Sequence, residues 1–190
     1  MIWTAVYRRE ITIELYGEHI YLREFKEEDW TAVHQYASDE RVCRYQPWGP
    51  NTEEESRGFV CQNIHDASLK PRSRYCLAII EKMGHRLIGA GEIHIRDLCF
   101  RNGEIGYSLH PSFWGKGFAT EAALLLIDLG FNKLNLHRIY ATCDPRNTAS
   151  YMVMKKAGLT CEGRLRENLL IKDGWRDSLL YSILETDPRP

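Results

Sequence analysis

The stretch Trp114-Gly115-Lys116-Gly117-Phe118-Ala119-Thr120 connects a predicted strand over 104–109 to a strongly apolar helix predicted over 119–134. Glycine lets the backbone turn tightly and lets a ligand approach its amide groups closely. The first turn of the following helix presents unpaired N–H groups and a partial positive charge, which together bind phosphate. The stretch is therefore a candidate phosphate site, and taken alone it is equally typical of a turn that only connects strand and helix. Lys116 either adds a full charge there or stays solvated at the rim.

Two common phosphate loops do not fit this stretch. A Walker A loop requires glycine at position 110, where the chain has His110, and Ser or Thr after the lysine, where it has Gly117. The dinucleotide-binding fingerprint requires a third glycine where Thr120 stands. The sequence therefore disfavours both nucleotide hydrolysis and dinucleotide binding at this loop.

The segments after the loop continue a strand–helix alternation. A short strand is predicted at 138–143, ended by Asp144-Pro145, and a helix follows at 147–157. Gly158 stands at the left-handed position that commonly ends a helix. Because a helical crossover of this length joins parallel strands, the strands at 104–109 and 138–143 are predicted to be parallel neighbours.

The remaining segments complete a fold of the α/β class in its mixed (α+β) form. Thr52 and Glu55 form a capping box that opens a helix. Strands at 164–171 and 175–183 surround Asp173-Gly174 and predict a C-terminal β-hairpin. We expect a mixed central sheet with helices on both faces. Its other predicted elements are strands at 11–16, 19–23, 75–80 and 87–95 and helices at 27–37 and 52–65.

Length and composition fit one soluble domain over 1–190, with a core at about 11–184. The chain has 190 residues, of which 44% are hydrophobic and 27% charged, as in ordinary globular proteins. Its longest apolar run, residues 122–127, is far shorter than the ~18 residues of a membrane-spanning helix. The first ten residues show no apolar signal core. We therefore expect a cytoplasmic protein without a membrane partner.

The charge balance argues against a nucleic-acid-binding protein, and the spacing of cysteines and histidines argues against a metal-binding one. Lys plus Arg is 25 and Asp plus Glu is 26, a net charge of −1. Proteins that bind nucleic acid directly usually carry a strong excess of basic residues. The six cysteines form no Cys-x-x-Cys pair, and the seven histidines form no metal-binding pattern. We expect no metal, and thiols that are reduced and mostly buried.

The chain resembles the GNAT superfamily of acyl-CoA-dependent N-acetyltransferases. The pyrophosphate loop of that superfamily reads Gln/Arg-x-x-Gly-x-Gly/Ala, which residues 114–119 match except that Trp114 replaces the first residue. Tryptophan there is familiar in the branch of the ribosomal-protein N-terminal (alanine/serine) acetyltransferases. Further motifs of that branch follow over about 19–183, namely Glu104-Ile105-Gly106-Tyr107, Thr120-Glu121-Ala122, Asn147-Thr148-Ala149-Ser150, Lys156-Ala157-Gly158-Leu159, Glu162-Gly163-Arg164-Leu165-Arg166-Glu167 and Asp177.

The resemblance implies acetyl-CoA as the donor and suggests which residues hold it. The two parallel strands would splay apart and take the pantetheine arm between them, while the loop amides hold the pyrophosphate. Asn147 would bond the arm, and it is also a plain helix N-cap; the two roles are compatible. The cofactor residues implied in this way are Ser108, Leu109, His110, Trp114, Gly115, Lys116, Gly117, Phe118, Ala119, Thr120, Asn147 and Ser150.

The resemblance also implies direct attack of a neutral amine on the thioester. Ser150 matches the serine near the cofactor sulfur, where a hydroxyl bonds or protonates the leaving thiolate; Met154 stands where other branches carry a tyrosine acid. Glu104 matches a strand position that holds a glutamate base, and from the neighbouring strand Glu92 would reach the same cleft. The alternatives are a serine that faces solvent and carboxylates that are only solvated or ion-paired.

We therefore expect an acetyl-CoA-dependent N-acetyltransferase that acts on a primary amine, most closely a protein N-terminal amine as in ribosomal-protein acetylation. Tyr45, Trp48 and the helix over 53–65 would wall the acceptor cleft. One alternative is a small-molecule acceptor such as an antibiotic, a polyamine or an amino-acid-like amine. Another is a non-catalytic acyl-CoA-binding module. The C-terminal hairpin would offer an edge for a homodimer.

Overall fold

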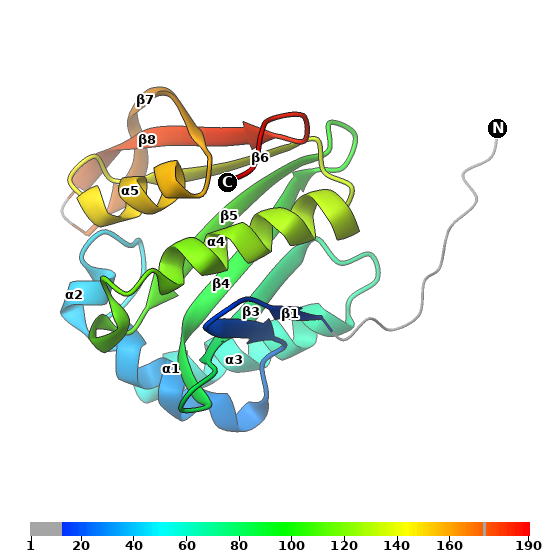
Figure 1. The fold of residues 1–190 in the computed structure, drawn as a ribbon. Coiled ribbons are helices and arrows are strands. Elements are labelled where there is room, and N and C mark those ends of the chain that lie inside the picture. The colour runs from blue at the N-terminus through cyan, green and yellow to red at the C-terminus, as the bar shows by residue number, and fades with distance from the viewer. Residues whose placement is uncertain (1–12, 173) are drawn as a thin grey trace.

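A mixed β-sheet with a helical layer on each face forms the framework of the computed structural model, which describes residues 13–172 and 174–190 (Figure 1). Within these ranges the sheet has the strand order β1-β2-β3-β4-β5-β6-β8-β7. Neighbouring strands are antiparallel except for β5 and β6, which are parallel as predicted. The strands are β1 (Glu14–Tyr16), β2 (Ile20–Arg23), β3 (Arg74–Glu81), β4 (Arg86–Asp97), β5 (Asn102–Leu109), β6 (Arg138–Cys143), β7 (Thr160–Ile171) and β8 (Gly174–Leu184).

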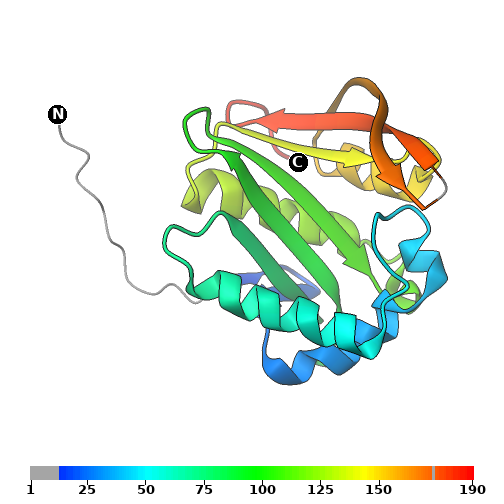
Figure 2. The same cartoon turned by 180° about the vertical axis from the view of Figure 1, so that it is seen from behind.

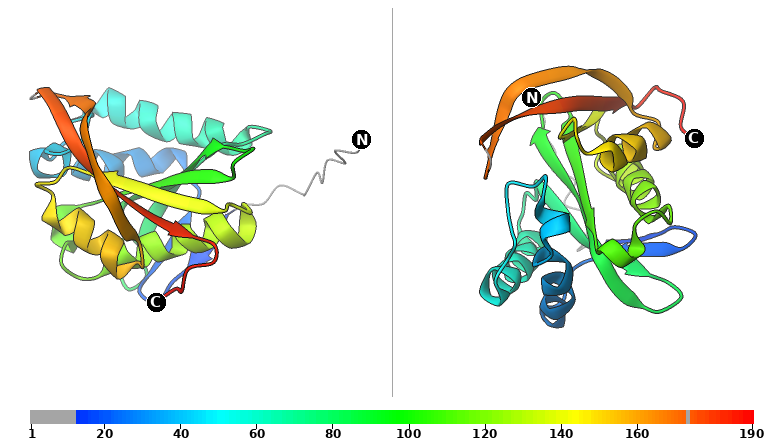
Figure 3. Two further views of the ribbon diagram at one scale, coloured as in Figure 1. Left: turned by 90° about the horizontal axis from the view of Figure 1, so that it is seen from above. Right: turned by 90° about the vertical axis from the view of Figure 1, so that its left-hand side faces the viewer.

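The helices divide between the two faces of the sheet, as Figure 3 shows in its right-hand view. One layer holds α1 (Trp30–Ala37), α2 (Glu40–Cys43) and α3 (Glu53–Ser68), and the other holds α4 (Phe118–Asp128) and α5 (Thr148–Lys156). The short turns are η1 (Glu27–Asp29), η2 (Pro111–Phe113) and the π-helical η3 (Leu129–Lys133).

Two hydrophobic clusters, one on each face, hold these layers together. Side chains alternate along a strand, so Leu77 and Ile79 of β3 pack in the cluster under α4. Cys76, Ala78 and Ile80 of the same strand pack in the cluster under α1 and α3. The near-continuous apolar sequence of β3 is therefore explained by burial on both sides.

The parallel pair β5 and β6 separates along its length. Three residue pairs join the strands, the last being Glu104 with Tyr140. Beyond that point β5 continues to Leu109 and β6 to Cys143 without further pairing between them. Figure 2 shows the two strands starting side by side and then diverging. The predicted splay of the sheet is confirmed, and it opens a gap in the middle of the sheet.

The long helix predicted over 119–134 differs from the structure. The α-helix ends at Asp128 and continues as the π-helical turn η3, in which the amide of Leu134 donates to Leu129 O at 3.0 Å. Gly130 lies in this turn against the sheet, where a Cβ atom would stand 2.5 Å from Ile139 Cδ1. Because glycine has no side chain, the widened turn packs directly on β6.

Other elements agree with the prediction within a few residues. The capping box is confirmed, since Thr52 Oγ1 accepts from the Glu55 amide at 3.2 Å and Glu55 Oε2 accepts from the Thr52 amide at 2.7 Å. Gly158 has the expected left-handed φ of 87°. The single turn α2 was not predicted, because its four residues show no helical periodicity. Asp173, predicted as part of a hairpin turn, and residues 11–12 of the first predicted strand lie outside the described residues. In the described ranges no helix is both long and apolar enough to cross a membrane.

Candidate active site

A cavity of about 660 Å³ opens where β5 and β6 separate. Strands β4, β5, β6 and β8 line it, with the start of α5 on one side and the loop 45–48 on the other. Alternation along the strands turns Glu92, His94 and Glu104 toward the α1/α3 face, because their neighbours Ile93 and Ile105 pack under α4. Tyr107 and Ser150 line the same cavity from the α4/α5 side. The cavity therefore connects the two faces of the sheet.

The glycine loop after β5 has the backbone that the sequence predicted. Gly115 and Gly117 have φ values of 74° and 85°, in the left-handed region that favours glycine. A Cβ atom at either position would meet nothing within 4 Å, so conformation and not space requires glycine there. Gly117 is the N-cap of α4, which begins at Phe118. The first amides of α4 have no partner within the helix, as a phosphate site requires.

Trp114 ties this loop to the end of β5. Its indole Nε1 donates to the carbonyl oxygen of Leu109 at 2.8 Å. The His110 amide donates to Ile88 O at 2.8 Å, so this group is already bonded within the protein. Leu109 O keeps one lone pair, because a carbonyl oxygen accepts two hydrogen bonds. Lys116 Nζ lies 5.2 Å from the centre of the Phe113 ring, beside the loop.

Ser150 sits at the start of α5 and is held by Asn147 and by Tyr107 of β5. Asn147 Oδ1 accepts from the Ser150 amide at 3.1 Å, which confirms Asn147 as the N-cap. The Tyr107 hydroxyl donates to Ser150 O at 3.1 Å and lies 3.4 Å from Ser150 Oγ. Burial raises the pKa of Tyr107, so the phenol stays protonated at neutral pH. Burial also raises the pKa of Cys143, on the facing strand β6, to about 11.

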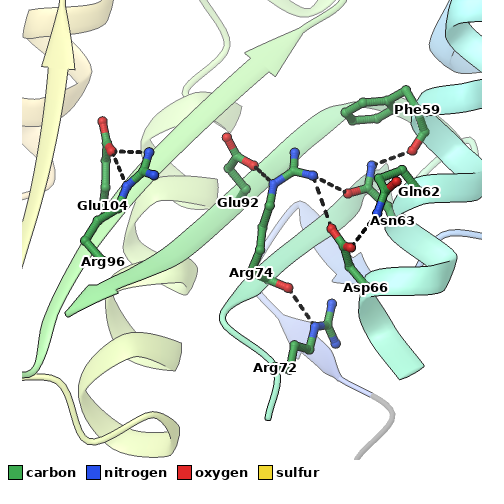
Figure 4. A network of polar contacts seen from close by, with 9 residues as sticks. All are labelled: Phe59, Gln62, Asn63, Asp66, Arg72, Arg74, Glu92, Arg96 and Glu104. Atoms are coloured by element: carbon green, nitrogen blue, oxygen red, sulfur yellow. Dashed lines mark hydrogen bonds and ion pairs between the residues drawn. The ribbon is translucent and has the colours of Figure 1, made fainter. Parts of the chain in front are cut away.

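Both candidate bases are ion-paired with arginines (Figure 4). Glu104 Oε2 lies 2.7 Å from Arg96 Nη2, and Glu92 Oε2 lies 2.7 Å from Arg74 Nε. The Arg74 guanidinium continues to Asp66 on α3, so that Glu92 belongs to a network between the sheet and that helix. Both carboxylates therefore line the cavity, and each has a cationic partner.

His94 is a third proton acceptor in the cavity that the sequence reasoning missed. Burial lowers its pKa and the nearby charge of Arg96 adds to the effect, which favours a neutral imidazole. A neutral imidazole accepts protons near pH 7. The histidines were considered only for metal patterns, although His94 stands two residues after Glu92 and so on the same face of β4.

Arg176 of β8 lines the cavity wall across the gap from β5 and was also missed. It is only 8% exposed. Its Nη1 donates to Tyr45 O at 2.6 Å and its Nη2 to Ser178 Oγ at 3.2 Å, while its Nε has no hydrogen-bond partner in the described structure. Burial lowers the pKa of Arg176, although the charge of Asp144 acts in the opposite direction. The alternating pattern of β8 was the available signal for an arginine that points inward.

A smaller cavity of about 290 Å³ adjoins the first one between the sheet and the helices α1 and α3. The two cavities share Trp48, Glu92, Gly106, Tyr107 and Ser108. Its other walls are mainly apolar and include Val33, Tyr36, Ala37, Phe59, Cys76 and Ala90. Tyr45 and Trp48 line the larger cavity, whereas α3 reaches only the smaller one.

Thiols and other potential metal ligands lie apart from one another. Among the described residues no group of three or more His, Cys, Asp and Glu side chains could hold a metal ion. All six cysteines are free, and the expectation that most are buried was wrong. Cys61, Cys99 and Cys161 are exposed because they lie on the outer face of α3, in the β4–β5 turn and on the edge strand β7.

Comparisons with known sequences agree with this geometry. Residues 19–160 match the family model described as the acetyltransferase (GNAT) domain. The chain is 37% identical over 174 residues to the N-acetyltransferase YnaD of Bacillus subtilis (strain 168), covering 90% of this chain and 96% of that protein. It is 29% identical to the spermidine N(1)-acetyltransferase of Escherichia coli (strain K12), covering 86% of this chain and 85% of that protein.

Solved structures share the fold over almost the whole chain. A GNAT-family acetyltransferase from Bacillus anthracis superposes with a TM-score of 0.81 at 35% identity, covering 92% of this chain and all of that one (100%). A ribosomal-protein-S5-alanine acetyltransferase from Vibrio fischeri superposes with a TM-score of 0.80 at 28% identity, covering 94% and 100%. The family model spans most of the described chain, and the relatives share its length. The chain is therefore an N-acetyltransferase that belongs to the GNAT family.

Proposed function

We propose that this protein transfers an acetyl group from acetyl-CoA to the primary amine of a protein N-terminus. The observation that carries the proposal is the cavity at the β5–β6 gap, which joins a donor side under α4 and α5 to a separate acceptor side under α1 and α3. A donor and an acceptor that enter from opposite faces meet in the gap. Direct transfer between them follows from that arrangement.

The residues on the donor side fit acetyl-CoA. The left-handed Gly115 and Gly117 expose the first amides of α4, which would hold the pyrophosphate. The edges of β5 and β6 beyond their last pair offer backbone groups to the pantetheine amides. Asn147 and Ser150 lie beside this gap at the start of α5 and would contact the thioester end of the arm.

Residues of this chain on both sides of the gap support the transfer. Acetyl-CoA, when bound, supplies an activated acetyl group as a thioester. On the acceptor side, the neutral His94 takes the proton that the amine must lose, while Glu104 and Glu92 line the same cavity as ion-paired carboxylates. On the donor side, the Ser150 hydroxyl, positioned beside Tyr107, donates a hydrogen bond to the sulfur as the thiolate leaves. The protein itself forms no covalent bond to the acetyl group.

The charges of the cavity favour an N-terminal amine over a polyamine. The lining carboxylates each have an arginine partner, as seen for Glu92, Glu104 and Asp144. A polyamine carries several cations and calls for unpaired carboxylates, whereas an N-terminus has one amine with a pKa near 7.7–8.0. The smaller apolar cavity gives room for the side chain of the first residue. A structural relative at 28% identity is a ribosomal-protein-S5-alanine acetyltransferase.

The second candidate is a small-molecule amine. The observation in its favour is the 29% identity with a spermidine N(1)-acetyltransferase along 86% of this chain. The two candidates differ in what the smaller cavity does, because a linear polyamine has no side chain to place there.

An acceptor screen separates the candidates. We would measure thiol release from acetyl-CoA with peptides that begin with Ala, Ser, Leu or Phe, with spermidine, with an aminoglycoside and with free amino acids. We expect the peptides to give the highest kcat/KM. Turnover of spermidine alone would favour the second candidate. Saturable binding of acetyl-CoA without turnover of any amine would indicate a non-catalytic module, and no binding of acetyl-CoA would refute both.

A cavity-filling variant sharpens this screen. Ala90 lines the smaller cavity from β4, so Ala90→Leu places three more carbon atoms in it. We expect the variant to lose turnover of peptides that begin with Leu or Phe and to retain turnover of those that begin with Ala. Its acetyl-CoA affinity and melting temperature serve as controls for the fold. An equal loss of turnover with all peptides would contradict the proposal that this cavity holds the side chain of the first residue.

A further inference from the structure

We propose that Arg176 binds an acyl oxygen of the acceptor, either a carboxylate or a peptide carbonyl. The acceptor is then an aminoacyl compound, in which an amine and an acyl oxygen are read by two different walls of the cavity. This inference rests on the proposed transfer to an amine and adds a second group that the acceptor must carry.

Ion pairing sets Arg176 apart from the other arginines of the larger cavity, the one of about 660 Å³. Three arginines line it. Arg96 pairs with Glu104 at 2.7 Å, and Arg138 pairs with Glu162 at 2.6 Å. Within the described part of the chain, Arg176 has no carboxylate at ion-pair distance. Among the described residues, the cavity of about 660 Å³ therefore holds one arginine without a direct counter-charge.

The hydrogen bonds of Arg176 are also incomplete. A guanidinium has five N–H donors, and the described bonds of this one go to two neutral oxygens, Tyr45 O and Ser178 Oγ. Its Nε has no partner although the residue is only 8% exposed. Burying a charge or a polar group without compensation is costly, so such a group calls for a partner from outside the fold.

The carboxylate whose charge acts on Arg176 already bonds another arginine. Asp144 acts on Arg176 through its charge, but its two oxygens bond Arg146, with Oδ1 at 3.0 Å from Nε and Oδ2 at 2.8 Å from Nη2. These bonds outweigh the burial of Asp144 and lower its pKa, so it stays ionised in this pairing. Asp144 therefore contributes to the field around Arg176 without filling its donors.

The position of Arg176 fits an acceptor with two unlike ends. Its side chain is on the α1/α3 face of β8, because the alternating residues Leu179, Tyr181 and Ile183 pack on the other face. Glu92 and His94 line the same cavity from β4, on the far side of the gap. His94 on that wall accepts a proton from the amine and Arg176 binds the acyl oxygen, so the cavity is complementary to an aminoacyl group. A polyamine has nothing for Arg176 to bind.

A comparison of acceptors with and without acyl oxygens tests this role. We would measure kcat/KM for alanylglycine, L-alanine and isopropylamine with the wild type, Arg176→Gln, Arg176→Lys and Arg138→Gln. Isopropylamine keeps the branched amine of alanine and lacks the acyl group. For each enzyme, the preference is the ratio of kcat/KM for the acyl-bearing acceptor to kcat/KM for isopropylamine. Differences in amine basicity cancel when these preferences are compared between enzymes.

We expect Arg176→Gln to reduce this preference by roughly tenfold or more, the usual effect of a lost hydrogen bond to a charged group. Arg176→Lys keeps part of the preference because it keeps the charge. Arg138→Gln, the matched control, keeps all of it because Glu162 already neutralises Arg138. A larger loss with alanine than with alanylglycine identifies a carboxylate as the preferred group, and an equal loss identifies the carbonyl.

A purely structural role gives a different result. Arg176 also holds Tyr45, and loss of that bond would lower turnover of isopropylamine by the same factor as turnover of alanine. An unchanged preference would therefore overturn the inference and leave the proposed function intact. If no amine is turned over, the proposed function fails, and calorimetry with N-acetylalanine and N-isopropylacetamide on the CoA-saturated protein decides the role of Arg176. Equal affinity for the two amides in the wild type would then overturn it.

Discussion

The indole nitrogen of Trp114 donates a 2.8 Å hydrogen bond to the carbonyl oxygen of Leu109, the last residue of β5. This bond joins the glycine loop to the strand that borders the gap in the sheet. In the motif of the family this position holds Gln or Arg, and the tryptophan of this chain uses its single N–H to fix the loop. The loop and the gap are thereby placed relative to one another before any ligand binds.

Trp114→Phe should weaken acetyl-CoA binding several-fold, because the loss of one hydrogen bond of about 1 kcal/mol frees the loop. The melting temperature should change little, since Trp114 is 48% exposed. Calorimetric titration with acetyl-CoA measures the effect. Trp175→Phe, on the hairpin far from the loop in sequence and 65% exposed, is the matched control. Equal affinities for both variants would show that the indole bond does not organise the donor site.

Gly117→Val should reduce acetyl-CoA affinity by tenfold or more. The φ of 85° disfavours any side chain by roughly 1–2 kcal/mol, and the loop would relieve this strain by turning its amides away from the pyrophosphate. Gly58→Val is the control, because Gly58 lies in α3 with open space around it and without a left-handed φ. Unchanged affinity in Gly117→Val would remove the loop from the donor site.

Ser150→Ala should lower kcat by at least about tenfold and leave acetyl-CoA affinity nearly unchanged, because the hydroxyl stabilises the sulfur only as the thiolate leaves. Tyr107→Phe should have a smaller effect in the same direction, since its hydroxyl lies 3.4 Å from Ser150 Oγ and orients it. The double variant should be no slower than Ser150→Ala. Additive losses in single-turnover kinetics would mean that the two hydroxyls act independently.

The pH dependence of kcat/KM distinguishes the candidate bases. Burial and Arg96 keep the pKa of His94 below its ordinary value of 6.5, so the neutral, proton-accepting form predominates above that value. The rate should fall as the pH drops through the lowered pKa, because the imidazole then becomes protonated. His94→Gln should remove this acid limb and lower the rate at neutral pH, while Glu104→Gln should keep the limb. The opposite pattern would identify Glu104 as the base.

The backbone of the donor site could be predicted from the sequence because local rules fix it. The two glycines of the loop, the N-cap Asn147 and the capping box at Thr52 each involve contacts within a few residues. The order of strand, helix and strand around the loop was sufficient to predict the parallel pair. The π-helical turn at Gly130 could not be predicted from local sequence. It packs closely on Ile139, which belongs to a strand further along the chain.

The acceptor side was predicted less completely, because its properties arise from contacts between distant segments. Glu92 and Glu104 were identified, but their arginine partners depend on the register of β3, β4 and β5. His94 becomes a candidate base only through burial in the assembled cavity. Arg176 meets Tyr45 across 131 positions of sequence, and no local pattern indicates that one of its donors is left without a partner.

Because β5 and β6 separate, hydrogen exchange in these two strands can show whether a ligand fills the gap between them. Beyond Glu104 and Tyr140 the two strands have facing backbone groups that no longer pair with each other. Amide hydrogens at 105–109 and 141–143 that point into the gap therefore exchange with solvent faster than those at 102–104. A ligand with its own amides that fills the gap would act as an inserted strand and slow this exchange. Hydrogen–deuterium exchange along these two segments would thus report donor binding residue by residue, without any acceptor or turnover.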